Sequence, residues 1–380
     1  MTSGVAIVGV AQTCYEAAKD HLAYNELVYE VVAKLLRETG VKMADIHSQI
    51  TASQDMFDGK TISSMSVNEV VGGYLKSEAK VAADGLQAAL YGAARILSGS
   101  FEYTLITAHA KESESRRPAV TVSMFDPFTQ RPLGLHDAIS SGLQAERYLH
   151  VSGVTEENMA ELSRRRHLDA KKNPLAQRAG DFTTKQILES PQMAGPLREM
   201  MVSPSSDGAC AVLLASAERA SAFGKRAVWI TGTGNCTDAY WTERDLAEAR
   251  ALELAAAKAY KAAGIRNPAK ELDVAEISAR CAFEEPMYAD ALQLFDGDPR
   301  AWIRQSAKGE GIAVNPSGGA ITGNPTSVAG LTRLAEAYLQ VSGQAGEHQV
   351  AGARTALAHA ADGICGQGHT VVVLRGNSGN

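Results

Sequence analysis

The chain has 380 residues, enough for two domains of ordinary size or for one large domain built from two similar halves. Hydrophobic residues make up 45% and charged residues 21% of it, a balance typical of a globular protein with packed α/β layers. The net charge of −6, without a long Lys/Arg run, argues against nucleic acid as a partner. No apolar stretch is long enough to cross a membrane and no secretory signal is recognisable, so we expect a cytoplasmic protein.

The cysteines argue against a disulfide framework and against a zinc site. They are odd in number, lie far apart and include no CxxC pair, whereas both kinds of site need paired cysteines at short or regular spacing. We therefore expect reduced thiols and no bound metal. The positions are Cys14, Cys210, Cys236, Cys281 and Cys365.

The first half of the chain predicts alternating strands and helices. Val5–Val10 is a short apolar run typical of a buried strand, and the apolar spacing from Leu27 to Leu36 predicts a helix that Gly40 ends. The next expected elements are a strand near residue 50, a helix over 85–97 and a strand over 103–108.

The second half repeats this order. A strand over 228–233 precedes an Ala-rich helix over 246–263, which Thr242 would cap and Gly264 would end. A strand over 274–277, a helix over 326–341 and a strand over 371–374 follow. The alternation predicts parallel sheets covered on both faces. We divide the chain into an N-terminal half, 1–220, with a loop domain inserted at about 110–205, and a C-terminal half, 221–380.

Four segments carry a family resemblance, in the right order along about residues 4–375. They are VAIVGVAQT at 5–13, HLDAKKNPLAQ at 167–177, SPSSDGACAVLLAS at 203–216 and NPSGGAITGNP at 315–325. Together they resemble thiolases of the sterol-carrier and archaeal acetyl-CoA acetyltransferase type.

The resemblance implies an α/β protein with a five-layer α-β-α-β-α fold, made of two duplicated βαβαβ halves with an inserted loop domain. It also implies a dimer and a coenzyme A thioester as substrate or ligand, with no covalently bound cofactor. Thiolases make or cleave carbon–carbon bonds with a nucleophilic Cys, a His and a second Cys that move protons, and an Asn or His at the oxyanion hole. A thiolate attacks the thioester while fixed donors stabilise the oxyanion.

Three positions that the resemblance assigns to this chemistry hold unsuitable side chains. In the Ala82-Ala83-Asp84-Gly85 frame, Ala82 stands at the nucleophile position and Asp84 is an expected helix N-cap, with a catalytic carboxylate as the alternative. Asn324 replaces the His of a Gly-His-Pro segment and can orient a carbonyl without acting as a base. Ser278 stands where the oxyanion-hole residue is expected.

Several further residues are tentative candidates. Cys365, with His369 nearby, lies close to the expected second Cys, and Tyr240 could serve as an acid, although packed roles are the alternatives. The glycines of the retained frames are candidates for an acyl-CoA groove: Gly318, Gly319 and Gly323. The basic run from Arg164 to Arg166 with Lys171 and Lys172 could meet CoA phosphates or form a solvated helix face.

Three functions follow, in order of preference. The first is a catalytically degenerate subunit of a thiolase or acyltransferase complex, paired with a complete thiolase-like chain in a heterodimer. The second is a non-covalent acyl-CoA carbon–carbon lyase of the retro-aldol type, working with a small zinc-ribbon/OB-fold partner. The third is a binding module for acyl-CoA or another lipid.

Overall fold

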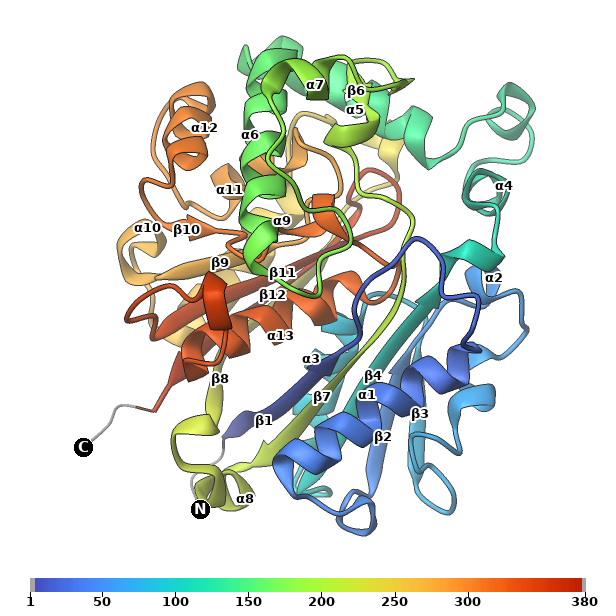
Figure 1. The fold of residues 1–380 in the computed structure, drawn as a ribbon, viewed down its shortest axis with the longest axis vertical. Helices are drawn as coiled ribbons and strands as arrows, with labels where there is room; N and C mark the ends of the chain where they lie inside the picture. Colours follow the sequence, from blue (N-terminus) through green and yellow to red (C-terminus); the bar gives the residue numbers. More distant parts are fainter. Residues whose placement is uncertain (1–3, 378–380) are drawn as a thin grey trace.

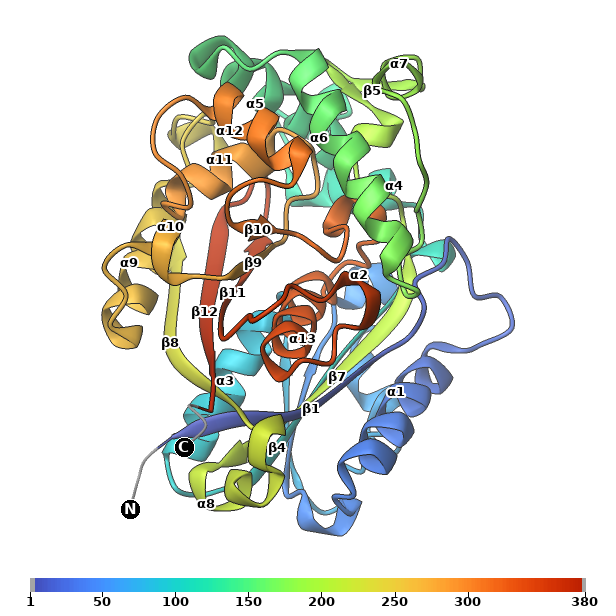
Figure 2. The same cartoon turned by 60° about the vertical axis from the view of Figure 1, so that its left-hand side comes forward.

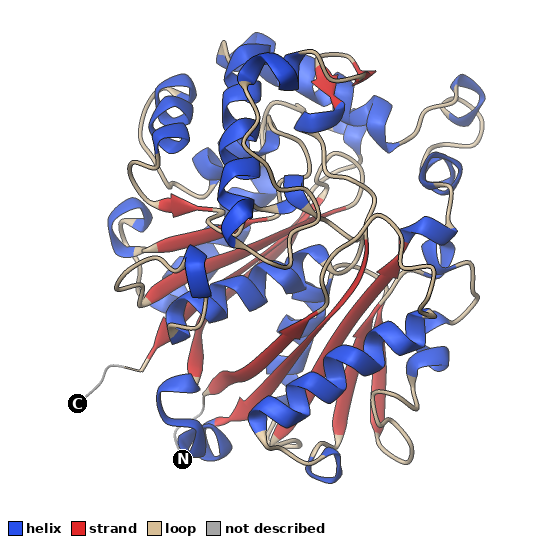
Figure 3. Ribbon diagram, in the orientation of Figure 1, coloured by secondary structure: helices blue, strands red, loops and turns tan. Residues whose placement is uncertain are grey.

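The computed structural model describes residues 4–377 and contains a ten-stranded sheet in the order β10-β9-β11-β12-β8-β1-β7-β4-β2-β3. The first half contributes β1 (Val5–Gln12), β2 (Ser48–Ala52), β3 (Ser77–Val81), β4 (Tyr103–Lys111) and β7 (Asp207–Ser216). The second contributes β8 (Val228–Thr237), β9 (Val274–Ile277), β10 (Ala313–Val314), β11 (Thr355–Asp362) and β12 (Gly368–Gly376). Figure 3 shows these strands in two groups.

The two halves have the same strand order. When the five strands of each half are numbered along the chain, both sheets place them side by side in the order third, second, fourth, fifth and first, counted from the outer edge. The halves join through their first strands, β1 and β8, by only two antiparallel residue pairs, Ala6 with Trp229 and Ile7 with Val228. The sheet therefore consists of two five-stranded units that meet at one narrow seam.

Helices complete five layers (Figures 1 and 2). Between the two sheets lie α3 (Gly85–Leu97) and α13 (Ala329–Ser342), whose apolar faces share one buried cluster with both sheets. The outer faces are covered by α1 (Tyr24–Thr39) on the first half and α9 (Arg250–Ala263) on the second. The predicted α-β-α-β-α architecture is confirmed.

The segment between β4 and β7 packs at one end of the second half, teal to green in Figure 1. It contains α4 (Arg117–Thr121), α5 (Asp137–Ser152), α6 (Glu156–Asp169), α7 (Thr184–Leu188), and the hairpin of β5 (Gln192–Ala194) and β6 (Leu197–Arg198). Beside it lie α11 (Glu284–Ala291) and α12 (Pro299–Lys308). Short helices elsewhere are α2 (Asp55–Asp58), α8 (Ala217–Ala220) and α10 (Pro268–Glu271).

Most predicted elements are present, and three predictions need correction. The sheets are mixed and not parallel throughout, because β7 and β12 each run antiparallel to both of their neighbours. The Ala-rich helix begins at Arg250 rather than at 246, and Thr242 lies in a separate 3₁₀ turn instead of capping it. Asp245 explains the late start because its Oδ1 accepts a hydrogen bond from the Ala247 backbone at 2.9 Å, which favours a turn over a helix. The last long helix begins at Ala329 rather than at 326.

The strands that were not predicted are β3, β7, β10, β11 and the hairpin strands β5 and β6. Strand β11 has the sequence TALAHAAD, with few of the branched residues that favour strands. Its small side chains suit a close approach of α13, since a Cβ added at Gly330 would lie 2.4 Å from the Cβ of Ala360. Within residues 4–377, no helix is both long enough and apolar enough to cross a membrane.

Candidate functional site

Loops from both halves meet around a small cavity of about 50 Å³, which we call the central pocket. It lies where α3 and α13 begin, next to the ends of β9 and β11. Two residues assigned by the sequence, Ser278 and Asn324, line it together with Asp84. Its other polar lining residues are Gln54, Arg280, Glu284, Tyr288, Thr326, Ser327 and Asp362.

Ser278 and Asn324 are both held in place by their backbones. The Ser278 backbone donates to the His359 carbonyl at 3.2 Å, and the Asn324 backbone donates to Ser206 Oγ at 3.1 Å. The side-chain oxygen of Asn324 is buried and has no hydrogen-bond partner within residues 4–377. This oxygen can therefore accept a hydrogen bond from a ligand, which would offset the cost of burying it unsatisfied.

Asp84 joins the two central helices. Its Oδ1 accepts from the Leu86 backbone at 2.8 Å, which confirms the predicted cap of α3, and its Oδ2 accepts from the Gly330 backbone of α13 at 2.9 Å. Burial raises the pKa of this carboxyl to about 7; the two backbone donors oppose that rise and the nearby Asp362 carboxyl adds to it. A carboxyl with a pKa near neutrality is suited to proton transfer.

Ala82 does not line the central pocket. It follows β3 directly and is exposed, three residues before the retained Gly85. Gly85 has a packing role, since a Cβ there would lie 2.6 Å from Leu331 Cβ and 3.1 Å from the Ser327 carbonyl. The glycine thus allows α3 and α13 to approach closely enough to share Asp84.

Tyr288 is one of the lining residues that the sequence did not reveal. Its hydroxyl is buried, has no hydrogen-bond partner among the described residues, and belongs to a ring that packs edge-on against His359 and His369. Burial, reinforced by Glu284, raises the pKa of Tyr288 well above its usual value, so the phenol stays protonated near neutral pH. Helix α11 is buried on almost every side, so no amphipathic pattern marked this residue.

The tentative residues Cys365 and Tyr240 lie outside the lining of the central pocket. Cys365 is buried, its Sγ lies 3.5 Å from the Ser140 carbonyl, and burial raises its pKa to about 11, which disfavours the thiolate. The Tyr240 hydroxyl donates to Gln130 Oε1 at 2.8 Å. His369 lies behind Tyr288, and burial lowers its pKa to about 4, so it is neutral near pH 7. Catalytic roles for these residues stay predictions.

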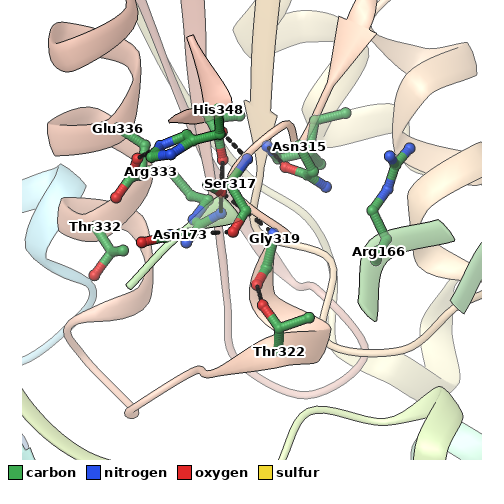
Figure 4. A network of polar contacts seen from close by, with 12 residues as sticks. Arg166, Asn173, Asn315, Ser317, Gly319, Thr322, Thr332, Arg333, Glu336 and His348 are labelled. Atoms are coloured by element: carbon green, nitrogen blue, oxygen red, sulfur yellow. Dashed lines mark hydrogen bonds and ion pairs between the residues drawn. The ribbon is translucent and has the colours of Figure 1, made fainter. Parts of the chain in front are cut away.

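The glycines Gly318, Gly319 and Gly323 also lie outside that lining. Gly319 lies beside a buried polar network, because its backbone donates to Ser317 Oγ at 3.3 Å. Ser317 Oγ donates to Glu276 at 2.8 Å, and Arg333 Nη1 donates to both Glu276 at 2.6 Å and Ser317 at 2.8 Å (Figure 4). Positive φ angles of 96° and 68° at Gly318 and Gly319 form the turn that places Ser317 there. Groove formation by these glycines stays a prediction.

The basic run does not form one exposed surface. Arg166 is buried and its guanidinium donates to Glu285 at 2.7 Å, to Asp169 at 3.0 Å and to Ser306 at 2.7 Å. Arg165 pairs with Asp169 at 2.9 Å. Arg166 therefore anchors α6 to the second half, whereas Arg165 pairs within α6.

A larger cavity of about 640 Å³, which we call the loop pocket, adjoins the central pocket through Arg280, which lines both. Its lining comes mainly from the segment between β4 and β7 and includes Pro118, Ala138, Met193, Leu197 and Val202. It combines this apolar surface with Arg117, Arg178 and Arg280. Arg280 thus lies at the boundary between the two cavities.

Comparisons with known proteins agree with this architecture. Residues 232–375 match the family model described as Thiolase C-terminal domain-like. Acetyl-CoA acetyltransferase from Methanothermobacter thermautotrophicus is 27% identical over 97% of this chain and 98% of the relative. Benzoylsuccinyl-CoA thiolase subunit BbsB from Thauera aromatica is 26% identical over 61% of this chain and 62% of that protein.

Solved structures share the whole fold. The Ltp2-ChsH2(DUF35) aldolase superposes with a TM-score of 0.83 at 19% identity, covering 99% of this chain and 98% of that one. Human mitochondrial 3-ketoacyl-CoA thiolase gives a TM-score of 0.75 at 17% identity, with 99% of both chains covered. The chain therefore has a thiolase fold and is related in sequence to thiolase-like acyl-CoA proteins.

Proposed function

We propose that this chain is a carbon–carbon lyase of the retro-aldol type that acts on an acyl-CoA without a covalent intermediate. The observation that carries the proposal is the pairing, in one pocket, of the Asp84 carboxyl, whose pKa is about 7, with the unpartnered Tyr288 hydroxyl. Thiolytic chemistry needs a nucleophilic thiol, and no cysteine lines this pocket. A retro-aldol cleavage needs only a base, an acid and donors for a carbonyl oxygen.

The proposed reaction starts from a β-hydroxyacyl thioester. Asp84 accepts the proton of the β-hydroxyl, the bond between the α and β carbons breaks, and its electron pair forms the thioester enolate. Asn324 and Ser278 orient the thioester carbonyl, and Tyr288 donates a proton to the α carbon. Transfer of a proton from Asp84 back to Tyr288 restores both groups. The products are a carbonyl compound and a shortened acyl-CoA, with no net oxidation.

The test uses the purified chain, alone and with a small zinc-ribbon/OB-fold partner, and a β-hydroxyacyl-CoA as substrate. Mass spectrometry follows the shortened acyl-CoA. We expect Tyr288→Phe and Asp84→Asn each to lower the rate by about 10²-fold or more, the usual contribution of a general acid or base. Tyr260→Phe is the matched control, because the Tyr260 hydroxyl donates to the Leu292 carbonyl elsewhere in the core. Product formation that is unaffected by Tyr288→Phe would reject this assignment.

The degenerate-subunit function remains the second candidate, supported by the exposed Ala82 at the assigned nucleophile position. It predicts no cleavage by this chain in either preparation, but thiolysis once a complete thiolase-like chain is added. That pattern of products would reject the lyase proposal in favour of the degenerate-subunit function. A binding module predicts CoA binding without turnover in every combination.

A dimer is proposed as part of either function. Strand β3 is the edge of the first half, and its five residues are only half-buried. The neighbouring Tyr74 and Leu75 are 77% and 88% exposed. An edge strand next to exposed apolar side chains favours pairing with a second chain. Light scattering of Leu75→Glu, compared with the unmodified chain, tests this contact.

A further inference from the structure

Burial lowers the pKa of the Arg280 guanidinium and the nearby Glu284 and Asp137 carboxylates raise it by more, yet the hydrogen-bond donors of this cation are left unused. Its guanidinium has five N–H donors, yet it makes no hydrogen bond to any residue within 4–377, and its one ion pair there is a long contact of 3.8 Å with Asp137. Asp137 already pairs with Arg117 at 2.6 Å and accepts from Thr121 at 3.0 Å. Arg280 therefore presents unused donors where the central and loop pockets meet.

The other arginines of the loop pocket have partners. Arg117 pairs with Glu112 and Asp137 and donates to Thr326 at 2.8 Å. Arg178 donates to the Glu199 carbonyl at 2.9 Å and to the Val202 carbonyl at 3.3 Å. These two hold the walls of the pocket through hydrogen bonds, whereas the Arg280 guanidinium makes none among the described residues and offsets the charge of the buried Glu284 carboxylate.

The backbone of Arg280 is fixed although its side chain is free. The Ser203 backbone donates to the Arg280 carbonyl at 2.7 Å, and the Arg280 backbone donates to Glu284 Oε2 at 2.6 Å. Its side chain is only 24% exposed, so the guanidinium is held in a confined place and partly desolvated. A planar donor fork in such a position matches a carboxylate, which it can bind through two parallel hydrogen bonds.

We propose that Arg280 is a specificity-determining residue that binds a carboxylate on the acyl part of the substrate, so that the preferred ligand is a carboxyacyl-CoA. This inference rests on the proposed acyl-CoA function. The lining of the loop pocket contains three arginines and two carboxylates, Asp137 and Glu199, and the carboxylates of Glu112 and Glu284 also act on these arginines. The anion site is therefore assigned from the donors that Arg280 leaves unused and not from the net charge. Arg280 lies beside the central pocket, in which we place the reacting bond. The substrate carboxylate that it binds therefore belongs to the acyl chain and not to the distant nucleotide of CoA.

Calorimetric titration of the complete chain tests the proposal with matched thioesters. Malonyl-, succinyl- and glutaryl-CoA carry a carboxylate, and propionyl-, butyryl- and pentanoyl-CoA are their neutral counterparts. We expect at least one carboxylated member to bind about tenfold more tightly than its counterpart. Arg280→Gln should remove this preference and leave the neutral ligands within about threefold, whereas Arg280→Lys should keep part of it because the charge remains.

The outcomes separate this inference from the function on which it rests. Equal affinity for both members of every pair would overturn the inference while leaving the acyl-CoA function in place. A loss in Arg280→Gln that is equal for carboxylated and neutral ligands would also overturn it. Failure of all the thioesters to bind would overturn both. Circular dichroism verifies folding of the variants, and Arg147→Gln, which removes an exposed ion pair with Asp245, is the control expected to leave the affinities unchanged.

Discussion

Individual residues define the candidate chemistry through burial more than through identity. An aspartate that caps a helix is ordinary, and so is a tyrosine in a core. Asp84 acquires a pKa of about 7 because it is only 6% exposed, and the Tyr288 hydroxyl is kept protonated for the same reason. Desolvation thus gives, in the same pocket, a carboxyl that titrates near neutral pH and a phenol that stays protonated there.

The raised pKa of Asp84 predicts a pH-dependent stability. The folded state holds a proton on this carboxyl between the unfolded pKa of about 4 and the folded pKa of about 7, so the contribution of Asp84 to the unfolding free energy falls as pH rises through this window. The slope is at most about 1.4 kcal/mol per pH unit. The Asp84→Asn variant has no titrating group at this position, so it lacks this contribution to the pH dependence.

Urea unfolding of the unmodified chain and of Asp84→Asn between pH 4 and pH 8 provides the measurement. We expect the unfolding free energy of the unmodified chain to fall relative to that of the variant by a few kcal/mol across the window, and then to level off. A difference that stays constant with pH would show that the carboxyl is ionised throughout.

At the scale of elements, the close contact of α3 with α13 creates the site. Both helices begin at the central pocket, and both lack a side chain where they meet, at Gly85 and Gly330. A Cβ at Gly330 would lie 2.1 Å from Asp84 Oδ1. The two glycines therefore let one carboxylate accept hydrogen bonds from both helix ends.

Gly85→Ala tests this contact against helix propensity. Propensity alone would favour alanine by about 1 kcal/mol, but the new Cβ would meet Leu331 at 2.6 Å. We expect overpacking to dominate and to lower the unfolding free energy by about 1–3 kcal/mol. Leu97→Ala, an exposed change at the end of the same helix, should change it by less than about 0.5 kcal/mol. A stabilised Gly85→Ala variant would refute the tight contact.

At the scale of the whole molecule, a buried ion pair anchors the segment between β4 and β7. Arg166 of α6 meets Glu285 of α11 at 2.7 Å, and both side chains are almost fully buried. Asn315 supports Glu285 with a further hydrogen bond of 2.8 Å. The segment that supplies most of the lining of the loop pocket is thereby attached to the second half of the chain.

Arg166→Met should destabilise the protein by about 3–5 kcal/mol, because it leaves Glu285 buried without its cation. Thermal or urea unfolding measures the change. The double variant Arg166→Met/Glu285→Gln should recover part of the loss, since the uncompensated charge is then gone. Arg147→Ala, which breaks an exposed pair, should cost no more than about 1 kcal/mol. Equal effects of the two single variants would contradict an anchoring role for Arg166.

The sequence by itself determined the layers. Apolar spacing located α1, α3 and α9, because this signal is local and periodic. The duplicated five-layer fold was implied by the resemblance of four ordered motifs to thiolases. Strand β11 was not predicted because its alanines accommodate the close approach of α13, which lies elsewhere in the chain. Ser278 and Asn324 were assigned from motifs, and the structure brings them together with Asp84.

Only the tertiary structure decided which groups have the properties of a site. The free donors of Arg280, the unpartnered hydroxyl of Tyr288 and the pKa of Asp84 all depend on neighbours brought from distant parts of the chain. A sequence specifies where a side chain lies along an element. Desolvation and the presence or absence of a partner arise only when the elements pack together.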